Sequence, residues 1–331
     1  MHSVDLKKYN LRSDLIIESN LNYKKETYQE KDIVVDFVHL DRNNSLNKKS
    51  GDYITITFKD ITDEVNFKNV LNILDKELKK ILNSLNIKKT DKCLIIGLGN
   101  SKSTPDSLGS ETLKNILVTR YLEEIDLLDK KYRSVSILEA NVIANTGIDS
   151  FDMIEGVILK TKPDFIIAID SLAAINIERI EKTIQITNSG IHPGSGIGNN
   201  RKELSFDTLH IPVIAIGVPT VVSSAVIVND TIKYLTKKIS YQKKNLAKDK
   251  LTFKYNLNYL KEESDLSKKE KEELLGIIGT LSDDEIRELV YEVLNPIGYN
   301  LIVSTKEIDF IIKRLGKLIG DSINNSLHDN Y

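Results

Sequence analysis

The sequence predicts an α/β protein with a mainly parallel sheet that helices cover on both faces. From residue 93 onward, four apolar runs rich in β-branched residues recur, and helical patterns separate them. Each run is almost continuously apolar, which is typical of strands buried on both faces. A length of 331 residues suits one large α/β domain, alone or with small additions.

The composition excludes several functional classes. Lys and Arg number 46 against 48 for Asp and Glu, so no general field attracts nucleic acid or an anionic membrane. The single cysteine, Cys93, excludes an internal disulfide and a metal site of several thiolates. Because it lies inside an apolar strand, we expect a buried, unreactive thiol.

The chain is expected to be cytoplasmic and to make no membrane contact. No stretch approaches the roughly 20 apolar residues that a membrane span needs. The start, MHSVDLKKYN, lacks the apolar core of a secretion signal.

Before the alternating region, the pattern predicts a small β addition and a helix. Residues 1–30 are polar and lack a clear period. Two strand-like runs, Ile33–Leu40 and Tyr53–Phe58, flank a turn-rich segment, which predicts a hairpin-like addition over residues 15–60. Apolar residues then recur at spacings of three and four from Phe67 to Leu85, which predicts an amphipathic helix. Its expected cap is Thr62 or Asp63.

The alternating region supplies the main sheet. Its expected strands are Cys93–Leu98, Val135–Leu138, Phe165–Ile169 and Val213–Val218. Its expected helices are Glu111–Leu128, Asp149–Lys160 and Ala225–Lys238. Thr183–Thr187 is a candidate further strand that breaks the alternation.

The C-terminal part predicts a surface insertion and two helices. Residues 243–271 are rich in lysine and are expected to be a solvated insertion. The capping box Ser282–Glu285 begins one helix, and the other runs from Thr305 to about Leu327. We therefore expect residues 15–331 to form a single α/β domain.

The stretch GLGNSKSTPDSLGS, which starts at Gly97, resembles a phosphate-binding loop only in part. A dinucleotide loop needs a third glycine where Lys102 stands, and the Walker spacing is also missing. Gly97 and Gly99, followed by Asn100, instead suit a sharp turn at the end of a strand. That turn leads to Asp106, which either caps the next helix or lies at the edge of the sheet.

A second aspartate, Asp170, directly follows the strand Phe165–Ile169. It either caps a helix over Ser171–Arg179 or lies in the crevice where open α/β sheets bind ligands. If Asp106 and Asp170 approach each other, they can share a proton, so that one acts as base on a water and the other as acid. This arrangement suits amide hydrolysis without a nucleophilic side chain.

The second glycine-rich loop contains His192. The window around Ser195 reads PGSGI and lacks the G-x-S-x-G elbow of a serine hydrolase. His192 either assists chemistry or serves as a hydrogen-bonding scaffold, and a mixed site of Asp106, Asp170 and His192 stays open. The five histidines show no paired metal-ligand spacing, so no metal or other cofactor is expected.

Several long blocks together resemble the germination protease family of spore-forming bacteria. They are GLGNSKSTPDSLG, KPDFIIAIDSLAA, IERIEKTIQITNSGIHPGSGIGNNRKELS, IPVIAIGVPTVV and GTLSDDEIRELVYEVLNPIGYNLIVSTKEID. The resemblance implies an atypical aspartic endopeptidase, active as a homotetramer, that degrades small acid-soluble spore proteins during germination. It also implies a fold similar to that of hydrogenase-maturation peptidases. By motif match, the catalytic residues are Asp106 and Asp170.

The resemblance further implies a zymogen that removes its own propeptide in the forespore or spore core. Residues 12–19 resemble the family's cleavage pattern, so processing is expected between Asp14 and Leu15, with residues 1–14 as the propeptide. Without the resemblance, residues 1–19 are typical of a disordered terminus. The expected partners are spore proteins and further copies of the chain, without direct nucleic-acid contact.

Two other hypotheses come from different classes. One is a metal-dependent maturation-type peptidase in which the same carboxylates contact a metal. The other is a nucleotide-binding module that uses Gly97 and Gly99.

Overall fold

The computed structural model describes residues 14–19, 24–42, 44, 48–194, 202–245, 258–261, 266–294, 296–298 and 301–329. The chain forms two compact units. The larger unit comprises Leu11–Val221 and Ser304–Tyr331, and the smaller unit contains Val222–Val303. The expected boundary between a propeptide and a single domain at residue 15 stays a prediction.

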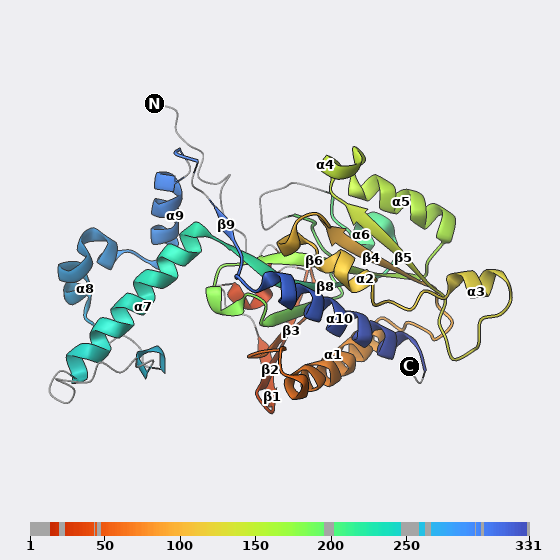
Figure 1. The fold of residues 1–331 in the computed structure, drawn as a ribbon, viewed down its shortest axis with the longest axis horizontal. Coiled ribbons are helices and arrows are strands. Elements are labelled where there is room, and N and C mark those ends of the chain that lie inside the picture. Colours follow the sequence, from red (N-terminus) through yellow and green to blue (C-terminus); the bar gives the residue numbers. More distant parts are fainter. Residues whose placement is uncertain are drawn as a thin grey trace. The chain divides into compact units, whose positions relative to one another are not determined.

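The larger unit is built on a mixed sheet with the strand order β1-β2-β3-β7-β8-β6-β4-β5 (Figure 1). Strand β4 pairs in parallel with β5 and β6, whereas β1, β2, β3, β7 and β8 are antiparallel neighbours. The α/β class is confirmed, and Thr183–Thr187 is the strand that breaks the alternation. The strands are β1 Lys25–Glu30, β2 Ile33–Leu40, β3 Gly51–Thr57, β4 Cys93–Gly99, β5 Val135–Asn141, β6 Phe165–Ala174, β7 Thr183–Thr187 and β8 Val213–Ser223.

Helices cover both faces of this sheet. On one face α1, α2 and α10 enclose the main apolar core, and on the other face α5 packs over a second core. Cys93 lies in the main core, where burial raises the pKa of its thiol. The helices of this unit are α1 Glu64–Ser84, α2 Leu108–Leu113, α3 Arg120–Glu124, α4 Ile143–Thr146, α5 Ser150–Thr161, α6 Phe206–Leu209 and α10 Ile308–Leu327. Short 3-10 helices occur at η2 Ile16–Glu18, η3 Thr104–Asp106 and η4 Ile177–Arg179.

Three local expectations differ from the structure. The single helix expected over Glu111–Leu128 is wrong, because the Leu117 amide donates to Asn324 Oδ1 of α10 at 3.0 Å rather than extending a helix. The alternative helix over Ser171–Arg179 is also wrong, because β6 continues to Ala174. Strand β1 was not expected, because it is an edge strand with mostly exposed, polar side chains, and its sequence therefore shows no apolar alternation.

The smaller unit is largely helical. The last two residues of β8 pair with β9, Ile302–Val303. The expected capping box is confirmed, since the Ser282 amide donates to Glu285 Oε2 at 2.7 Å at the start of α9. Of the expected lysine-rich insertion, residues 246–257 and 262–265 lie outside the described residues. The other elements are α7 Ser224–Asn245, η6 Asn258–Lys261, α8 Lys268–Leu275, η7 Gly276–Thr280 and α9 Asp283–Leu294.

No helix among the described residues has the length and apolar character needed to cross a membrane.

Candidate functional site

A sharp turn at the end of β4 positions Asp106. Gly99 has φ +102°, and a Cβ atom there would lie 2.2 Å from the Asp106 carbonyl oxygen and 2.9 Å from Asp106 Oδ1. The next amide, that of Asn100, donates to the same carbonyl at 3.0 Å. Only glycine fits this left-handed, closely approached position without strain.

Gly97 does not form part of the expected sharp turn but allows a close contact between β4 and α2. A Cβ atom on Gly97 would lie 2.8 Å from the Gly109 carbonyl carbon, and one on Gly109 would lie 2.4 Å from the Leu98 oxygen. The two glycines therefore let α2 rest directly on β4. In a dinucleotide loop, a third glycine at the position of Lys102 would let the helix approach the strand closely. In this chain, Gly109 allows that close approach of α2 to β4.

Asp106 is half-buried and precedes the helix cap. It ends η3, where its amide donates to the Ser103 carbonyl at 2.8 Å, and the N-cap of α2 is Ser107. The alternative that Asp106 caps the following helix is therefore wrong. Pro105, at the start of η3, fixes the backbone immediately before it.

Asp170 lies inside β6 and is only 5% exposed. Its Oδ1 accepts a hydrogen bond from the Ser171 amide at 2.9 Å. Along the strand it shares the side of Ile166 and Ala168, which belong to the core beneath α5. A carboxylate in so apolar a strand is costly to bury, which makes it a candidate for function.

The structure brings the Asp106 turn and β6 together at one edge of the sheet. Strands β4 and β6 are parallel neighbours, with Gly97 opposite Ile169, and η3 contacts β6. The Asp106 turn therefore follows the carboxyl end of β4, and Asp170 lies within β6, one residue beyond the Ile169 that pairs with Gly97 near that end.

A network of polar side chains that the sequence reasoning missed surrounds the turn. Asn145 Nδ2 donates to Asn100 Oδ1 at 2.7 Å, and Ser101 Oγ donates to Asn141 Oδ1 at 3.2 Å. Ser110 Oγ donates to Glu139 Oε1 at 3.0 Å. One signal could have indicated this network: Glu139 and Asn141 lie at the end of β5, the strand next to β4, and β4 and β5 end at the same edge of the sheet.

His192 pairs with Glu203 rather than with either candidate aspartate. Its Nε2 lies 2.9 Å from Glu203 Oε2, and Glu203 also contacts Lys49 and Ser205. These contacts match the scaffold interpretation of His192. In the described part of the chain, no group of three or more His, Cys, Asp and Glu side chains is arranged to hold a metal ion. Ser195 lies outside the described residues.

The expected processing junction is part of the larger unit and packs against the end of β6. Asp14 Oδ2 accepts a hydrogen bond from the Ala173 amide at 3.1 Å, at the end of β6. Leu15 is fully buried.

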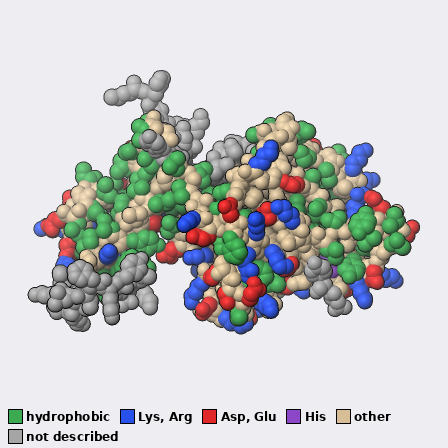
Figure 2. Space-filling view, viewed as in Figure 1, with side chains coloured by type: hydrophobic (Ala, Val, Ile, Leu, Met, Phe, Trp, Pro, Cys, Tyr) green, Lys and Arg blue, Asp and Glu red, His purple; other side chains and the backbone are tan. Residues whose placement is uncertain are grey.

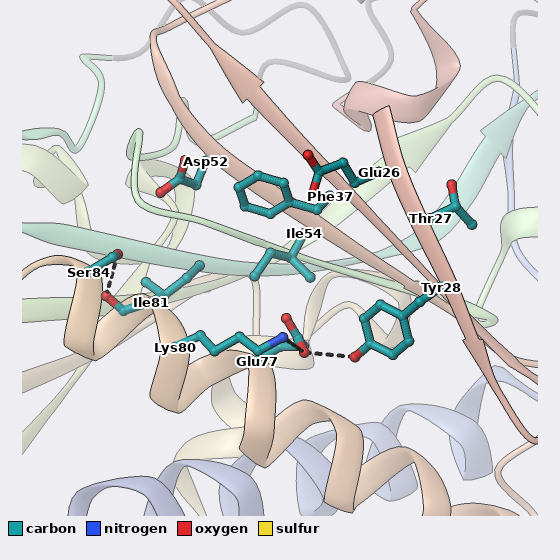
Figure 3. Close-up of a pocket in the computed structure, with 10 residues that line it drawn as sticks. All are labelled: Glu26, Thr27, Tyr28, Phe37, Asp52, Ile54, Glu77, Lys80, Ile81 and Ser84. Atoms are coloured by element: carbon teal, nitrogen blue, oxygen red, sulfur yellow. Dashed lines mark hydrogen bonds and ion pairs between the residues drawn. The ribbon is translucent and has the colours of Figure 1, made fainter. Parts of the chain in front are cut away.

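A separate pocket of 480 Å³ lies between α1 and strands β1 to β3 (Figure 3). Tyr28 Oη donates to Glu77 Oε1 at 2.7 Å, and Lys80 Nζ lies 2.6 Å from the same oxygen. Burial and this hydrogen bond raise the pKa of Tyr28. Because Glu77 is already satisfied and neither candidate aspartate lines the pocket, it is not the candidate site. Its lining residues are Glu26, Thr27, Tyr28, Phe37, Asp52, Ile54, Glu77, Lys80, Ile81 and Ser84.

Comparisons with known proteins identify the family. The germination protease family model matches residues 11–331. A germination protease of Geobacillus sp. (strain WCH70) is 41% identical over 359 residues, covering 99% of this chain and 96% of its own. That of Bacillus licheniformis is 41% identical over 352 residues, with coverage of 99% and 96%.

Among solved structures, a [NiFe] hydrogenase maturation protease from Thermococcus kodakarensis aligns with 43% of this chain and 80% of its own. The identity is 16% and the TM-score is 0.27, so the α/β class rests on the sheet described above. The match over residues 11–331 and the nearly full-length relatives are decisive. The chain therefore belongs to the germination protease family, and it is a protease of spore germination.

Proposed function

We propose that the chain is an endopeptidase that begins the degradation of small acid-soluble spore proteins, with Asp106 and Asp170 as its catalytic pair. One observation supports this most: Asp106 follows the carboxyl end of β4, and Asp170 lies in the adjacent parallel strand β6, one residue beyond the Ile169 that pairs with Gly97 near that end. Open α/β sheets bind their ligands at this edge.

In this mechanism one carboxylate accepts a proton from a water molecule, and the water oxygen attacks the peptide carbonyl carbon. The other carboxyl group, protonated, donates its proton to the leaving nitrogen as the C–N bond breaks. Two carboxylates that face each other cannot both ionise easily, so sharing one proton favours this division of roles.

The test is cleavage of a purified small acid-soluble spore protein by the chain that begins at Leu15. Asp106→Asn and Asp170→Asn are each expected to reduce kcat by about 10²- to 10⁴-fold, the usual contribution of a general acid or base. Asp152→Asn, an exposed aspartate on α5, is the matched control and keeps full activity.

Full activity in either variant would contradict the aspartate pair. Loss of activity with a chelator, restored by a transition metal, would instead favour the metal-dependent maturation-type alternative.

We also propose that the chain is made as a zymogen in the forespore and cuts itself between Asp14 and Leu15. An acidic residue before the bond and an apolar residue after it support this assignment. The same Asp106→Asn and Asp170→Asn changes in the full-length chain are expected to leave residues 1–14 attached, which intact mass measurement detects.

Self-association, as a homotetramer, is the third part of the proposal. Figure 2 shows hydrophobic side chains gathered on the surface of the smaller unit. Large exposed apolar patches are typical of protein interfaces. The exposed apolar residues of this unit include Leu235, Leu274, Ile277, Leu289, Val293, Ile297, Leu301 and Ile302.

A further inference from the structure

The segment from Asp14 to Glu18 is fixed along the end of β6. The Asp14 amide lies 3.5 Å from the Ala173 oxygen, and the Ala173 amide donates to Asp14 Oδ2 at 3.1 Å. Further along, the Ile175 amide donates to Glu18 Oε2 at 3.0 Å. The segment therefore runs beside residues 173–175 of the larger unit.

Its apolar side chains are part of the folded protein. Leu15 and Ile16 are both fully buried. Ile16 packs with Val38, Leu40 and Tyr53, on the side of the sheet opposite the main core. Val38, Leu40 and Tyr53 all follow the Asp14–Leu15 bond in the chain, so they remain as partners of Ile16 when residues 1–14 are removed.

Gln185 bridges the two sides of the Asp14–Leu15 peptide bond. Its Nε2 donates to the Asp14 carbonyl oxygen at 3.1 Å, and its Oε1 accepts from the Ile16 amide at 2.7 Å. It is buried on β7 between Ile184 and Ile186, which point into the main core on the other face. A buried amide side chain is costly unless it is hydrogen-bonded. The segment supplies the hydrogen-bond partners of the Gln185 amide, and these hydrogen bonds in turn hold the segment in place.

Lys48 supplies a second donor to the same carbonyl oxygen. Its Nζ lies 3.3 Å from that oxygen, and an ammonium donor gives a stronger hydrogen bond than a neutral one. The junction is also displaced from the candidate catalytic carboxylate. Asp14 meets β6 at Ala173, three residues beyond Asp170, and three extended residues span about 10 Å.

We propose that Gln185 and Lys48 hold the Asp14–Leu15 junction in the folded enzyme as a latch and thereby limit the rate of self-cleavage. This inference rests on the proposed processing at the Asp14–Leu15 bond. Hydrolysis needs a water oxygen to bond to the Asp14 carbonyl carbon, and the Leu15 nitrogen to leave with a proton. A buried junction about 10 Å along β6 from Asp170 must first open. The two side chains set the population of that open state.

The first experiment measures opening without self-cleavage. Full-length Asp170→Asn chain is treated with an added protease that cuts after acidic residues, and the fragment beginning at Leu15 is quantified by mass. Lys48→Met is expected to speed this cut about tenfold, the change in open population for one lost hydrogen bond, and Gln185→Leu, which removes two, is expected to speed it more. The controls Gln29→Leu and Lys59→Met change exposed side chains of the same types and leave the rate unchanged.

Unchanged or slower cutting in both latch variants would overturn the proposal. If Gln185→Leu does not fold, Lys48→Met alone decides, and Lys48→Arg is expected to restore the slow rate because it keeps the positive donor. Self-cleavage in this background before protease is added would count against the aspartate pair and not against the latch.

The second experiment follows removal of residues 1–14 in chains that keep both aspartates. The latch variants are expected to shorten the half-time of processing, whereas the same changes in a chain that begins at Leu15 leave cleavage of the spore protein unchanged. Slower processing would mean that Gln185 and Lys48 polarise the scissile carbonyl, which overturns the latch. A mature N-terminus other than Leu15 would refute the proposed processing site, while the added-protease experiment still tests the latch.

Discussion

At the scale of single residues, Gly99 is the position where backbone conformation and the candidate site meet. Gly99→Ala adds a Cβ atom at φ +102° that would lie 2.2 Å from the Asp106 oxygen. The turn must shift, so we expect Asp106 to be displaced and cleavage of the spore protein to fall at least about tenfold, in line with the sensitivity of catalysis to small misplacements.

The control for this change is Gly147→Ala. Gly147 also has a positive φ, +72°, but no atom lies within 4 Å of its added Cβ. It should cost about 1 to 2 kcal/mol of backbone strain and leave activity intact. Thermal unfolding and peptide cleavage, measured on both variants, separate strain from displacement. Equal activity in the two variants would argue against a turn that positions Asp106.

Single residues also show where sequence reasoning stops. The alternation in Thr183–Thr187 predicts a strand correctly, but it says nothing of the partner of Gln185, which lies about 170 positions away in the chain. Gly109 was missed for a related reason. Its contact with Gly97 crosses the whole loop, whereas the glycine motif is read only within six residues.

At the scale of elements, the end of α10 carries a pH-sensitive contact. His328 follows the helix and is 5% exposed, and its Nδ1 accepts a hydrogen bond from the Arg133 amide at 3.2 Å. Burial, together with the Arg133 charge, lowers the pKa of His328. Protonation is therefore harder in the folded state than in the unfolded state.

The sign of the effect follows from this lowered pKa. The contribution of His328 to stability is complete above its ordinary pKa of about 6.5 and is lost as the pH falls from there through the folded-state pKa. His328→Asn keeps an acceptor but cannot titrate. Between about pH 7.5 and about pH 5.5, the urea concentration at the midpoint of unfolding should fall less for the His328→Asn variant than for the parent chain. An equal fall in both proteins would contradict the assignment.

Elements that depend on their own apolar period were predictable, and those that depend on a neighbour were not. Helix α1 has a complete apolar stripe, and Asp63, one of its two expected caps, accepts from the Asn66 amide at 2.8 Å. The helix expected over Glu111–Leu128 ends early because Asn324 binds the Leu117 amide. Likewise, β6 extends to Ala174 although Asp170 interrupts its apolar run.

At the scale of the whole molecule, the apolar surface of the smaller unit is the basis for predicting self-association. Ile277 is 78% exposed and Val293 is 59% exposed, and both lie in the unit Val222–Val303. A charge at either position is not buried in the free chain, so folding should be unaffected. In an interface, however, the charge would lose its hydration without a partner.

The double change Ile277→Glu and Val293→Glu is therefore expected to shift the chain from the proposed tetramer toward smaller species in sedimentation velocity. Val65→Glu is the matched control, because Val65 is 68% exposed but lies on α1 in the larger unit. If the control dissociates equally, net charge rather than this surface is responsible. If the double variant stays tetrameric at the lowest measurable concentration, the apolar surface of the smaller unit is not the interface, and its exposed side chains require another partner.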